Sequence, residues 1–326
     1  MAAPPGSAAD LGALRVGVDV GGTKVEAVAL DASGAVVAHA RQRTIAGPRG
    51  VAASIVDAVR ALGVRPASVG VGVPGRVDGA RVRDAVNLGL TDVELGTVLA
   101  AELGVLVELA NDVNAAALGA HAARASGVPA TGGPGTGRAG TGAGASGARE
   151  PAESLAYLNI GTGVAAGIVI GGRVLRGADS VAGEIGHLSI DPAGPECACG
   201  QRGCVEAFAG GASVARRWGG GAEHPVREVF DRADAGDARA AELVAGVAFG
   251  IAAGARTLAL AVDPDRLVIG GGVTRIGERL RAAVLAALRD SAAGSPFLAS
   301  LRLDERIEFL APGESVGAIG AARLLA

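Results

Sequence analysis

The chain has 326 residues, which at about 100–200 residues per domain predicts two domains. Hydrophobic residues make up 49% and aromatic residues only 2%, so the core must be built mainly from Ala, Val, Leu and Ile. A net charge of −3 excludes broad electrostatic attraction to nucleic acid or an anionic membrane, and we expect neither as a partner.

The beginning of the chain does not resemble a secretory signal, because early Pro residues replace the basic start and apolar core of such signals. The apolar run 243–262 approaches the length of a membrane span, but it contains Arg256 and is bordered by Glu242 and Asp263. We therefore expect a buried helix there, no membrane span, and a cytoplasmic protein.

The first half of the chain contains short Val-rich runs separated by Gly turns, one run with the apolar periodicity of a helix, and one Ala-rich run. They predict strands at 14–20, 25–30, 35–40, 68–73 and 105–109 and helices at 48–62 and 113–125. The first three strands should be antiparallel, since only short turns join them.

Residues 126–152 contain nine Gly and a single branched apolar residue, Val128. Such a segment cannot bury enough surface to offset the entropy of ordering, so we expect a flexible surface insertion.

The second half repeats the opening pattern, because two apolar strands flank Gly161-Thr162-Gly163. This repetition predicts two similar α/β halves. We predict strands at 155–160, 164–170, 266–269, 301–303 and 307–310 and helices at 238–261, 275–289 and 315–325.

The first motif with chemical potential is Asp19-Val20-Gly21-Gly22-Thr23-Lys24, between two predicted strands. Glycines let a tight turn aim its backbone N–H groups at phosphate oxygens, and Asp19 can hold a hydrated Mg²⁺. Thr23 adds a hydroxyl, and Lys24 is the only Lys among the 30 basic residues. Taken alone, however, a Gly-Gly turn is more often structural.

Two further glycine turns follow apolar strands: Gly161-Thr162-Gly163 comes after Ile160, and Gly270-Gly271-Gly272 comes after Ile269. Either could simply end a strand. Three such turns in separate segments favour one nucleotide held between two lobes.

A second cluster contains every Cys of the chain, at positions 197, 199 and 204, and follows His187. One His and three Cys match the ligands of a closed tetrahedral zinc site, and Gly200 and Gly203 allow the backbone to fold around them. With four protein ligands the Zn²⁺ would be structural. The alternative is that the cysteines are buried small hydrophobes.

These motifs, above all the block from Gly183 to Glu206, resemble the ROK family (repressors, open reading frames, kinases), and within it the bacterial zinc-containing glucokinases. The resemblance runs from Arg15 to Leu324, apart from the Gly-rich insertion. It implies a two-lobed α/β fold of the actin-like, hexokinase-like ATPase type, which is ribonuclease H-like. The expected N-terminal lobe, 1–111, is completed by a helix at 312–326, and the C-terminal lobe, 112–311, carries the zinc loop 187–204 and the insertion.

The resemblance also implies roles for individual residues. Asp112 would be the general base, although Asn111-Asp112 before a helix is also a good N-cap. Without the resemblance, Glu184 and Glu206 could be capping or solvated acids. The implied sugar contacts are Gly75, Asn87, Asn111, Glu184, His187 and Glu206, and the implied nucleotide and magnesium contacts are Asp19, Gly21, Gly22, Thr23, Lys24, Gly161, Thr162, Gly163, Gly270 and Gly271.

We therefore expect an ATP- and Mg²⁺-dependent kinase that phosphorylates a hexose at its 6-hydroxyl, glucose first, as in glycolysis. Kinases for N-acetylmannosamine, N-acetylglucosamine, fructose or allose in the same family are the alternatives, and polyphosphate could replace ATP as donor. A sugar-responsive ROK repressor is disfavoured because only 18 residues precede Asp19, too few for its winged helix-turn-helix. The resemblance implies a homodimer or homotetramer.

Overall fold

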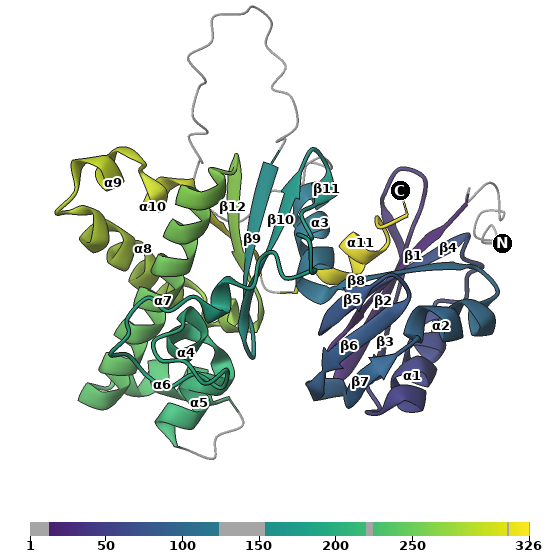
Figure 1. Cartoon of the computed structure of the whole chain (residues 1–326), viewed down its shortest axis with the longest axis horizontal. Coiled ribbons are helices and arrows are strands. Elements are labelled where there is room, and N and C mark those ends of the chain that lie inside the picture. The colour runs from purple at the N-terminus through teal and green to yellow at the C-terminus, as the bar shows by residue number, and fades with distance from the viewer. Residues whose placement is uncertain (1–12, 124–153, 220–223, 312, 326) are drawn as a thin grey trace, which may run out of the picture. The chain divides into compact units, whose positions relative to one another are not determined.

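The computed structural model describes residues 13–123, 154–219, 224–311 and 313–325, which divide into two compact units (Figure 1). Unit 1 comprises the described residues of Met1–Ser126 and Ser315–Ala326, and unit 2 those of Gly127–Glu314. The division differs from the sequence-based boundary at 111, because the helix that follows residue 111 packs within unit 1. The predicted flexible insertion at 126–152 lies outside the described residues.

Unit 1 is built on a five-stranded sheet with the order β3-β2-β1-β4-β8. The pairs β1/β2 and β2/β3 are antiparallel, as predicted, whereas β1, β4 and β8 run parallel. The Val side chains of β1 and β4 are fully buried, since helices cover both faces of the parallel part of the sheet. The strands are β1 (Arg15–Val20), β2 (Lys24–Leu30), β3 (Val36–Arg43), β4 (Ser68–Val73) and β8 (Leu106–Asn111).

A small sheet and a helix of unit 1 were not predicted. The antiparallel sheet β5-β6-β7 consists of short strands rich in charged residues, which carry little apolar alternation. Its elements are β5 (Arg76–Asp78), β6 (Arg81–Ala85), the 3₁₀ helix η1 (Val86–Leu88) and β7 (Leu90–Val93). The helices of unit 1 are α1 (Pro48–Ala61), α2 (Leu95–Leu103), α3 (Asp112–Ala123) and α11 (Val316–Ala321).

Glycines allow α11 to contact its neighbours through their backbones. A Cβ at Gly17 or Gly70 of the sheet would stand 1.9 or 1.8 Å from a carbonyl oxygen of α11. A Cβ at Gly320 would stand 1.7 Å from the Ala115 carbonyl of α3, and one at Gly119 would stand 1.9 Å from the Val316 carbonyl. The carboxyl end of the chain is therefore an integral part of unit 1.

Unit 2 repeats the topology of the first sheet, with the order β11-β10-β9-β12-β13. The pairs β9/β10 and β10/β11 are antiparallel, and β9, β12 and β13 are parallel. This repetition confirms the prediction of two similar α/β halves. The strands are β9 (Ser154–Ile160), β10 (Val164–Ile170), β11 (Arg173–Val174), β12 (Arg266–Gly270) and β13 (Ile307–Phe309).

The helices of unit 2 include several that the sequence analysis did not predict, namely α4, α6, α9 and α10. The described helices of unit 2 are η2 (Ile185–His187), α4 (Val205–Ala209), α5 (Gly211–Trp218), α6 (Pro225–Asp234), α7 (Ala238–Val262), η3 (Gly272–Ile276), α8 (Glu278–Ala292), α9 (Pro296–Ser300) and α10 (Leu303–Arg306). The helix predicted at 275–289 begins later because Gly277, with φ 77°, separates η3 from α8.

The predicted strand at 301–303 is wrong. Arg302 has a left-handed backbone with φ 49° and links α9 to α10, while Leu301 and Leu303 pack against the core. Two apolar residues around one Arg satisfy the alternation of a strand, but a bend between two short helices places both of them inward just as well.

Helix α7 is the one helix of the described residues that is long and apolar enough to cross a membrane. In the structure, 61% of its apolar window is buried, and its Leu, Val and Ala side chains form much of the core of unit 2. The prediction of a buried helix at 238–261 is confirmed.

Candidate functional site

The carboxyl ends of the parallel strands β1, β4 and β8 carry the predicted site residues of unit 1. The Gly21-Gly22 turn follows β1, Gly75 lies just after β4, and Asn111 and Asp112 join β8 to α3. Because parallel strands of one sheet end at the same edge, the fold brings these distant segments together.

The turn between β1 and β2 is tightly closed. The Gly21 N–H donates to the Lys24 carbonyl at 2.9 Å, and Thr44 Oγ1 donates to the Gly21 carbonyl at 2.7 Å. Gly22, Thr23 and Lys24 are exposed. The turn therefore presents a glycine backbone, a hydroxyl and an ammonium group to solvent, a combination that favours phosphate oxygens.

Asp19 and Asp112 lie close enough for their charges to interact. Burial raises the pKa of Asp19 from its ordinary 3.8 to about 7, and the charges of Asp112 and Glu26 add to this shift, while Lys24 opposes it. Gly317 of α11 faces the same group, since a Cβ there would stand 2.7 Å from Asp19 Cγ. A buried acid beside a second acid favours either a bound proton or a divalent cation.

Asn111 is the N-cap of α3. Its Oδ1 accepts the N–H groups of Val113 at 3.0 Å and Asn114 at 3.2 Å, and its Nδ2 donates to the Gly75 carbonyl at 3.1 Å. Gly75 has φ 94°, and a Cβ there would stand 2.5 Å from the Arg83 carbonyl. The Asn111 side chain thus fixes the start of α3 and retains one N–H for another acceptor.

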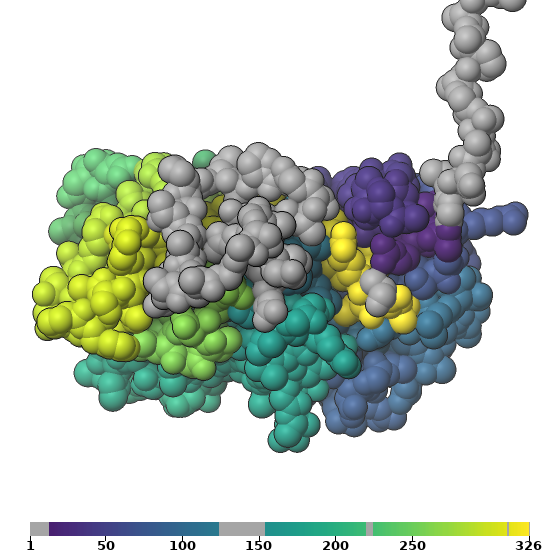
Figure 2. All heavy atoms as spheres, turned by 90° about the horizontal axis from the view of Figure 1, so that it is seen from above, coloured from purple at the N-terminus to yellow at the C-terminus, as the bar shows by residue number. Residues whose placement is uncertain are grey.

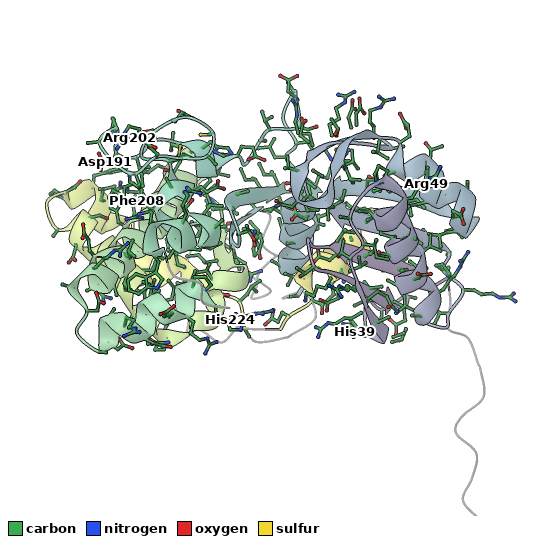
Figure 3. All side chains as sticks on the ribbon, turned by 90° about the horizontal axis from the view of Figure 1, so that it is seen from below. His39, Arg49, Asp191, Arg202, Phe208 and His224 are labelled. Atoms are coloured by element: carbon green, nitrogen blue, oxygen red, sulfur yellow. The ribbon has the colours of Figure 1, made fainter. Side chains whose placement is uncertain are left out.

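Lys24 is paired with a residue that the sequence analysis missed. Lys24 Nζ lies 3.1 Å from Glu26 Oε2, and the buried Glu26 carboxylate also accepts hydrogen bonds from His39, Arg41 and Ser315 (Figure 3 labels His39). Burial opposes ionisation of Glu26, yet these four hydrogen bonds outweigh it and lower its pKa to about 2. The available signal was the spacing, because residues two apart in a strand share a face.

Asn87 lies in η1 with its side chain exposed. A Cβ on Gly22 would stand 4.0 Å from Asn87 Cβ, so Asn87 neighbours the turn after β1. Within unit 1 the fold thus gathers the predicted residues at one edge of the sheet.

The two glycine turns of unit 2 also lie at one common edge of their sheet. Asn159 of β9 lies opposite Gly270 of β12, so the turn at 161–163 and the turn after Gly270 emerge side by side. Gly271 has φ 96°, and a Cβ there would stand 2.5 Å from the Ile160 carbonyl. Only glycine permits this approach of the two turns.

Glu206 of α4 holds the turn at 161–163 in place. Its Oε2 accepts the Val164 N–H at 2.9 Å, and a Cβ on Gly163 would stand 2.4 Å from the same oxygen. The first two carbonyls of the turn accept N–H groups from the start of α5 at 2.9 and 3.0 Å. The predicted sugar-binding Glu206 is thus a direct neighbour of the predicted phosphate turn.

Glu184 and His187 lie on a segment that packs against the backbone of β10. Cβ atoms at Gly183 and Gly186 would each stand 1.9 Å from a β10 carbonyl, so only glycine allows this contact. Glu184 is exposed and His187 is partly buried. Both residues are therefore held beside the strand that follows the 161–163 turn.

His187, Cys197, Cys199 and Cys204 form one cluster, with their ligand atoms within 4.8 Å of one another. The Cys199 and Cys204 Sγ atoms are 3.7 Å apart, and Cys197 Sγ lies 4.0 Å from His187 Nδ1. Tetrahedral zinc with Zn–S bonds of about 2.3 Å requires Sγ atoms about 3.8 Å apart, so the four side chains fit the ion.

The loop around the cysteines is shaped for this geometry. Gly200 and Gly203 have φ 91° and 70°, and a Cβ on Gly203 would stand 1.6 Å from the Asp191 carbonyl. Figure 3 labels Asp191 and Arg202, which lie near each other in this region. Gln201 Nε2 donates to the His187 carbonyl at 3.3 Å, which orients the histidine segment toward the cysteines.

Comparison with known proteins agrees with these features. The profile of the ROK family matches residues 15–131 and 138–326. The chain is 32% identical over 293 residues to a glucokinase of Halalkalibacterium halodurans, across 81% of this chain and 82% of the relative. It is 29% identical over 266 residues to an N-acetylmannosamine kinase of Yersinia pseudotuberculosis, across 78% and 82%.

Two crystal structures share the fold over 95% of the chain. The ROK hexokinase from Thermus thermophilus has a TM-score of 0.73 at 34% identity, with 96% of its own chain covered. A ROK family glucokinase from Streptomyces griseus, in complex with glucose and AMPPNP, has a TM-score of 0.72 at 26% identity, with 98% covered. The chain therefore belongs to the ROK family, with the α/β fold of actin-like and hexokinase-like ATPases, and is an ATP-dependent sugar kinase.

Proposed function

We propose that this kinase transfers the γ-phosphoryl group of ATP to the 6-hydroxyl of a hexose, with glucose as the preferred acceptor. The observation that carries the proposal is the pair of interacting acids, Asp19 and Asp112, beside the glycine turn after β1. A sugar hydroxyl needs a positioned carboxylate to accept its proton, and a transferring phosphoryl group needs a divalent cation.

Asp112 is the proposed general base. It is the first residue of α3, and the Asn111 cap fixes the position of that first turn. The positive end of the helix dipole favours the ionised carboxylate there. Asp19, whose pKa is raised by burial, is the better candidate for orienting a hydrated Mg²⁺, which would neutralise phosphate charge.

Backbone groups of the three glycine turns are the proposed phosphate and nucleotide contacts. Gly21, Gly22, Thr23 and Lys24 supply them in unit 1, and Gly161, Thr162, Gly163, Gly270 and Gly271 supply them in unit 2. Since Lys24 is paired with Glu26, its charge is partly compensated before any phosphate binds.

Sugar hydroxyls are the proposed partners of Gly75, Asn87, Asn111, Glu184, His187 and Glu206. Carboxylates accept hydrogen bonds from vicinal hydroxyls, and an imidazole bound to zinc through Nδ1 keeps Nε2–H as a donor. The contact of Glu206 with the Val164 N–H supports the proposal, because a sugar held by Glu206 would lie next to the phosphate turn. The four-ligand zinc is structural and takes no part in the chemistry.

A second acceptor is favoured by a specific observation. N-acetylmannosamine kinases resemble the chain over a similar length, at 29% identity, so an N-acetylhexosamine is the alternative to glucose.

The test is a coupled assay of ADP formation with ATP and Mg²⁺, comparing glucose, mannose, fructose and the N-acetylhexosamines. Polyphosphate replaces ATP in a parallel series.

Glucose should give the highest kcat/KM, with hexose 6-phosphate as product. A higher value for an N-acetylhexosamine would transfer the proposal to that substrate. If the protein phosphorylated none of these sugars with ATP, the proposal would be contradicted. The Asp112→Asn variant serves as the control for a contaminating host kinase.

A further inference from the structure

A cavity of about 380 Å³ opens in unit 2 among α7, α8, α9 and α10. Helices α8, α9 and α10 belong to the region coloured lime to yellow in Figure 2. The volume lies in the range of pockets that take small ligands. None of the residues assigned above to sugar, nucleotide or zinc lines it.

Arg256 of α7 is on the wall of this cavity. It is the only charged residue in the 20-residue apolar run 243–262, and it is partly buried. Among the described residues, no carboxylate or hydrogen-bond acceptor is paired with it. Burying part of a guanidinium without a counter-charge costs free energy. An anionic ligand group at Arg256 would remove this cost, so its binding there would be favourable.

The other charges of the wall nearly balance. Arg289 lies 3.6 Å from Asp304, and Arg302 is paired with Glu305. With Arg256 the wall carries three cations and two anions, a formal excess of one positive charge. That excess matches a ligand with one anionic group rather than a polyanion such as ATP.

The rest of the wall is suited to a small amphipathic molecule. Ser295 Oγ accepts the Leu298 N–H at 3.3 Å, so its own hydrogen is available to a ligand oxygen. Leu288, Pro296 and Leu298 supply apolar surface. Arg302 keeps a left-handed backbone with φ 49°, an uncommon conformation for a residue with a side chain.

The cavity is remote from the nucleotide turn of its own unit. Residues from the carboxyl end of α8 line it, whereas Gly270 and Gly271 precede the amino end of that helix. At 1.5 Å per residue, the 15 residues of α8 separate the two ends by about 20 Å. Figure 1 shows α9 and α10 at the end of α8.

We propose that this cavity is a second ligand site that binds a small molecule carrying one carboxylate or phosphate group, with Arg256 as the anion-binding residue. The shared chemistry is an oxyanion attached to a short, weakly polar body. The proposal does not depend on which sugar the kinase phosphorylates.

Calorimetric titration of the full chain tests it, with the nucleotide site filled by saturating magnesium AMPPNP and glucose. The probes are glycerol 3-phosphate, glycerate and, as the neutral match, glycerol. We expect one site per chain with a Kd below about 1 mM for at least one anion, and no binding of glycerol. The two anions distinguish a phosphate site from a carboxylate site.

Arg256→Gln should raise this Kd about tenfold or more, as expected for loss of a charge-assisted hydrogen bond. The matched control is Arg173→Gln, an exposed arginine on β11 at the opposite edge of the sheet, which should leave the Kd within about twofold. Should Arg256→Gln misfold, Arg289→Gln on the exposed face of α8 should still weaken binding, because it shifts the balance of wall charge. Absence of saturable anion binding, or a Kd unchanged in Arg256→Gln, would overturn the proposal.

Discussion

Asp19 lies beside other acids in a desolvated position, so its ionisation opposes folding. Its folded-state pKa of about 7 exceeds the ordinary 3.8, and the folded chain therefore holds a proton that the unfolded chain releases between these values. The contribution of Asp19 to stability is fully present below pH 3.8 and is lost as the pH rises toward about 7.

The Asp19→Asn variant should consequently melt at a higher temperature than the wild type at pH 8, without magnesium or nucleotide. At pH 4 the gain should nearly disappear, because Asp19 is then protonated. Thermal melts at the two pH values measure this difference. Asp57→Asn, an exposed acid on α1, is the control, and an equal gain for Asp19→Asn at both pH values would contradict the buried-acid explanation.

Gly163 is tested by adding one methyl group. In Gly163→Ala the new Cβ would stand 2.4 Å from Glu206 Oε2, so the carboxylate must leave the Val164 N–H. We expect kcat/KM for the sugar to fall by about tenfold or more, as for a displaced hydrogen-bonding group. Gly294→Ala, where a Cβ meets nothing within 4 Å, should remain near the wild-type value. Unchanged kinetics in Gly163→Ala would separate Glu206 from the sugar site.

The loop from His187 to Cys204 should depend on its metal. Burial and the neighbouring thiols raise the pKa of Cys204 to about 12, whereas hydrogen bonds from Gln201 and Cys197 lower that of Cys199 to about 6, so the three thiols do not ionise together without a cation. We expect one zinc per chain by elemental analysis of the purified protein. A chelator or Cys204→Ser should remove it and lower the melting temperature, and zinc should restore the chelated wild type. Full stability of the metal-free chain would contradict a structural zinc.

Contacts between α3 and α11 depend on glycine. In Gly320→Ala a Cβ would stand 1.7 Å from the Ala115 carbonyl, so the helices must separate. We expect a loss of about 1–3 kcal/mol in the free energy of unfolding, measured by denaturant titration. Gly254→Ala in α7 is the matched control, because its Cβ meets its neighbours at 3.4 Å or more and alanine favours the helix. Equal stability of the two variants would show that α11 can move away without cost.

The elements that the sequence predicted well are those with a strong apolar period. The strands at 15–20, 68–73 and 155–160 and the helix α7 bury Val, Leu and Ile at regular spacing. The small sheet β5-β6-β7 and helix α6 were not predicted because at least half of their residues are polar or charged, so they carry little apolar period. The strand predicted at 301–303 failed for the related reason that two leucines carry too short a pattern.

Residues within short sequence motifs were easier to predict than the contacts that surround them. The His and Cys spacing was enough to predict that these four side chains lie together, because they belong to one short loop. Gly317 could not be found this way, since Asp19, which it faces, is distant in sequence. For Glu26, the spacing from Lys24 was visible in the sequence, but the contact with Ser315 was not. The N-cap role of Asn111, which the sequence analysis kept as an alternative, is what the structure shows for its Oδ1.

At the level of the molecule, the two units repeat one sheet topology, and each brings glycine turns and acids to the carboxyl edge of its parallel strands. Within each unit, this arrangement brings residues from separate stretches of sequence to one edge of the sheet. Helix α11 completes unit 1, and its Gly317 faces Asp19.

The central claim is that Asp112 accepts the proton of the sugar hydroxyl, and Asp112→Asn tests it most directly. Glucose affinity, measured by calorimetry, and turnover with ATP should be determined on the same preparation. We predict a glucose Kd within about threefold of wild type and a kcat lower by about 10²–10⁴-fold, the usual contribution of a general base. A variant that binds glucose and turns over at nearly the wild-type rate would contradict the account.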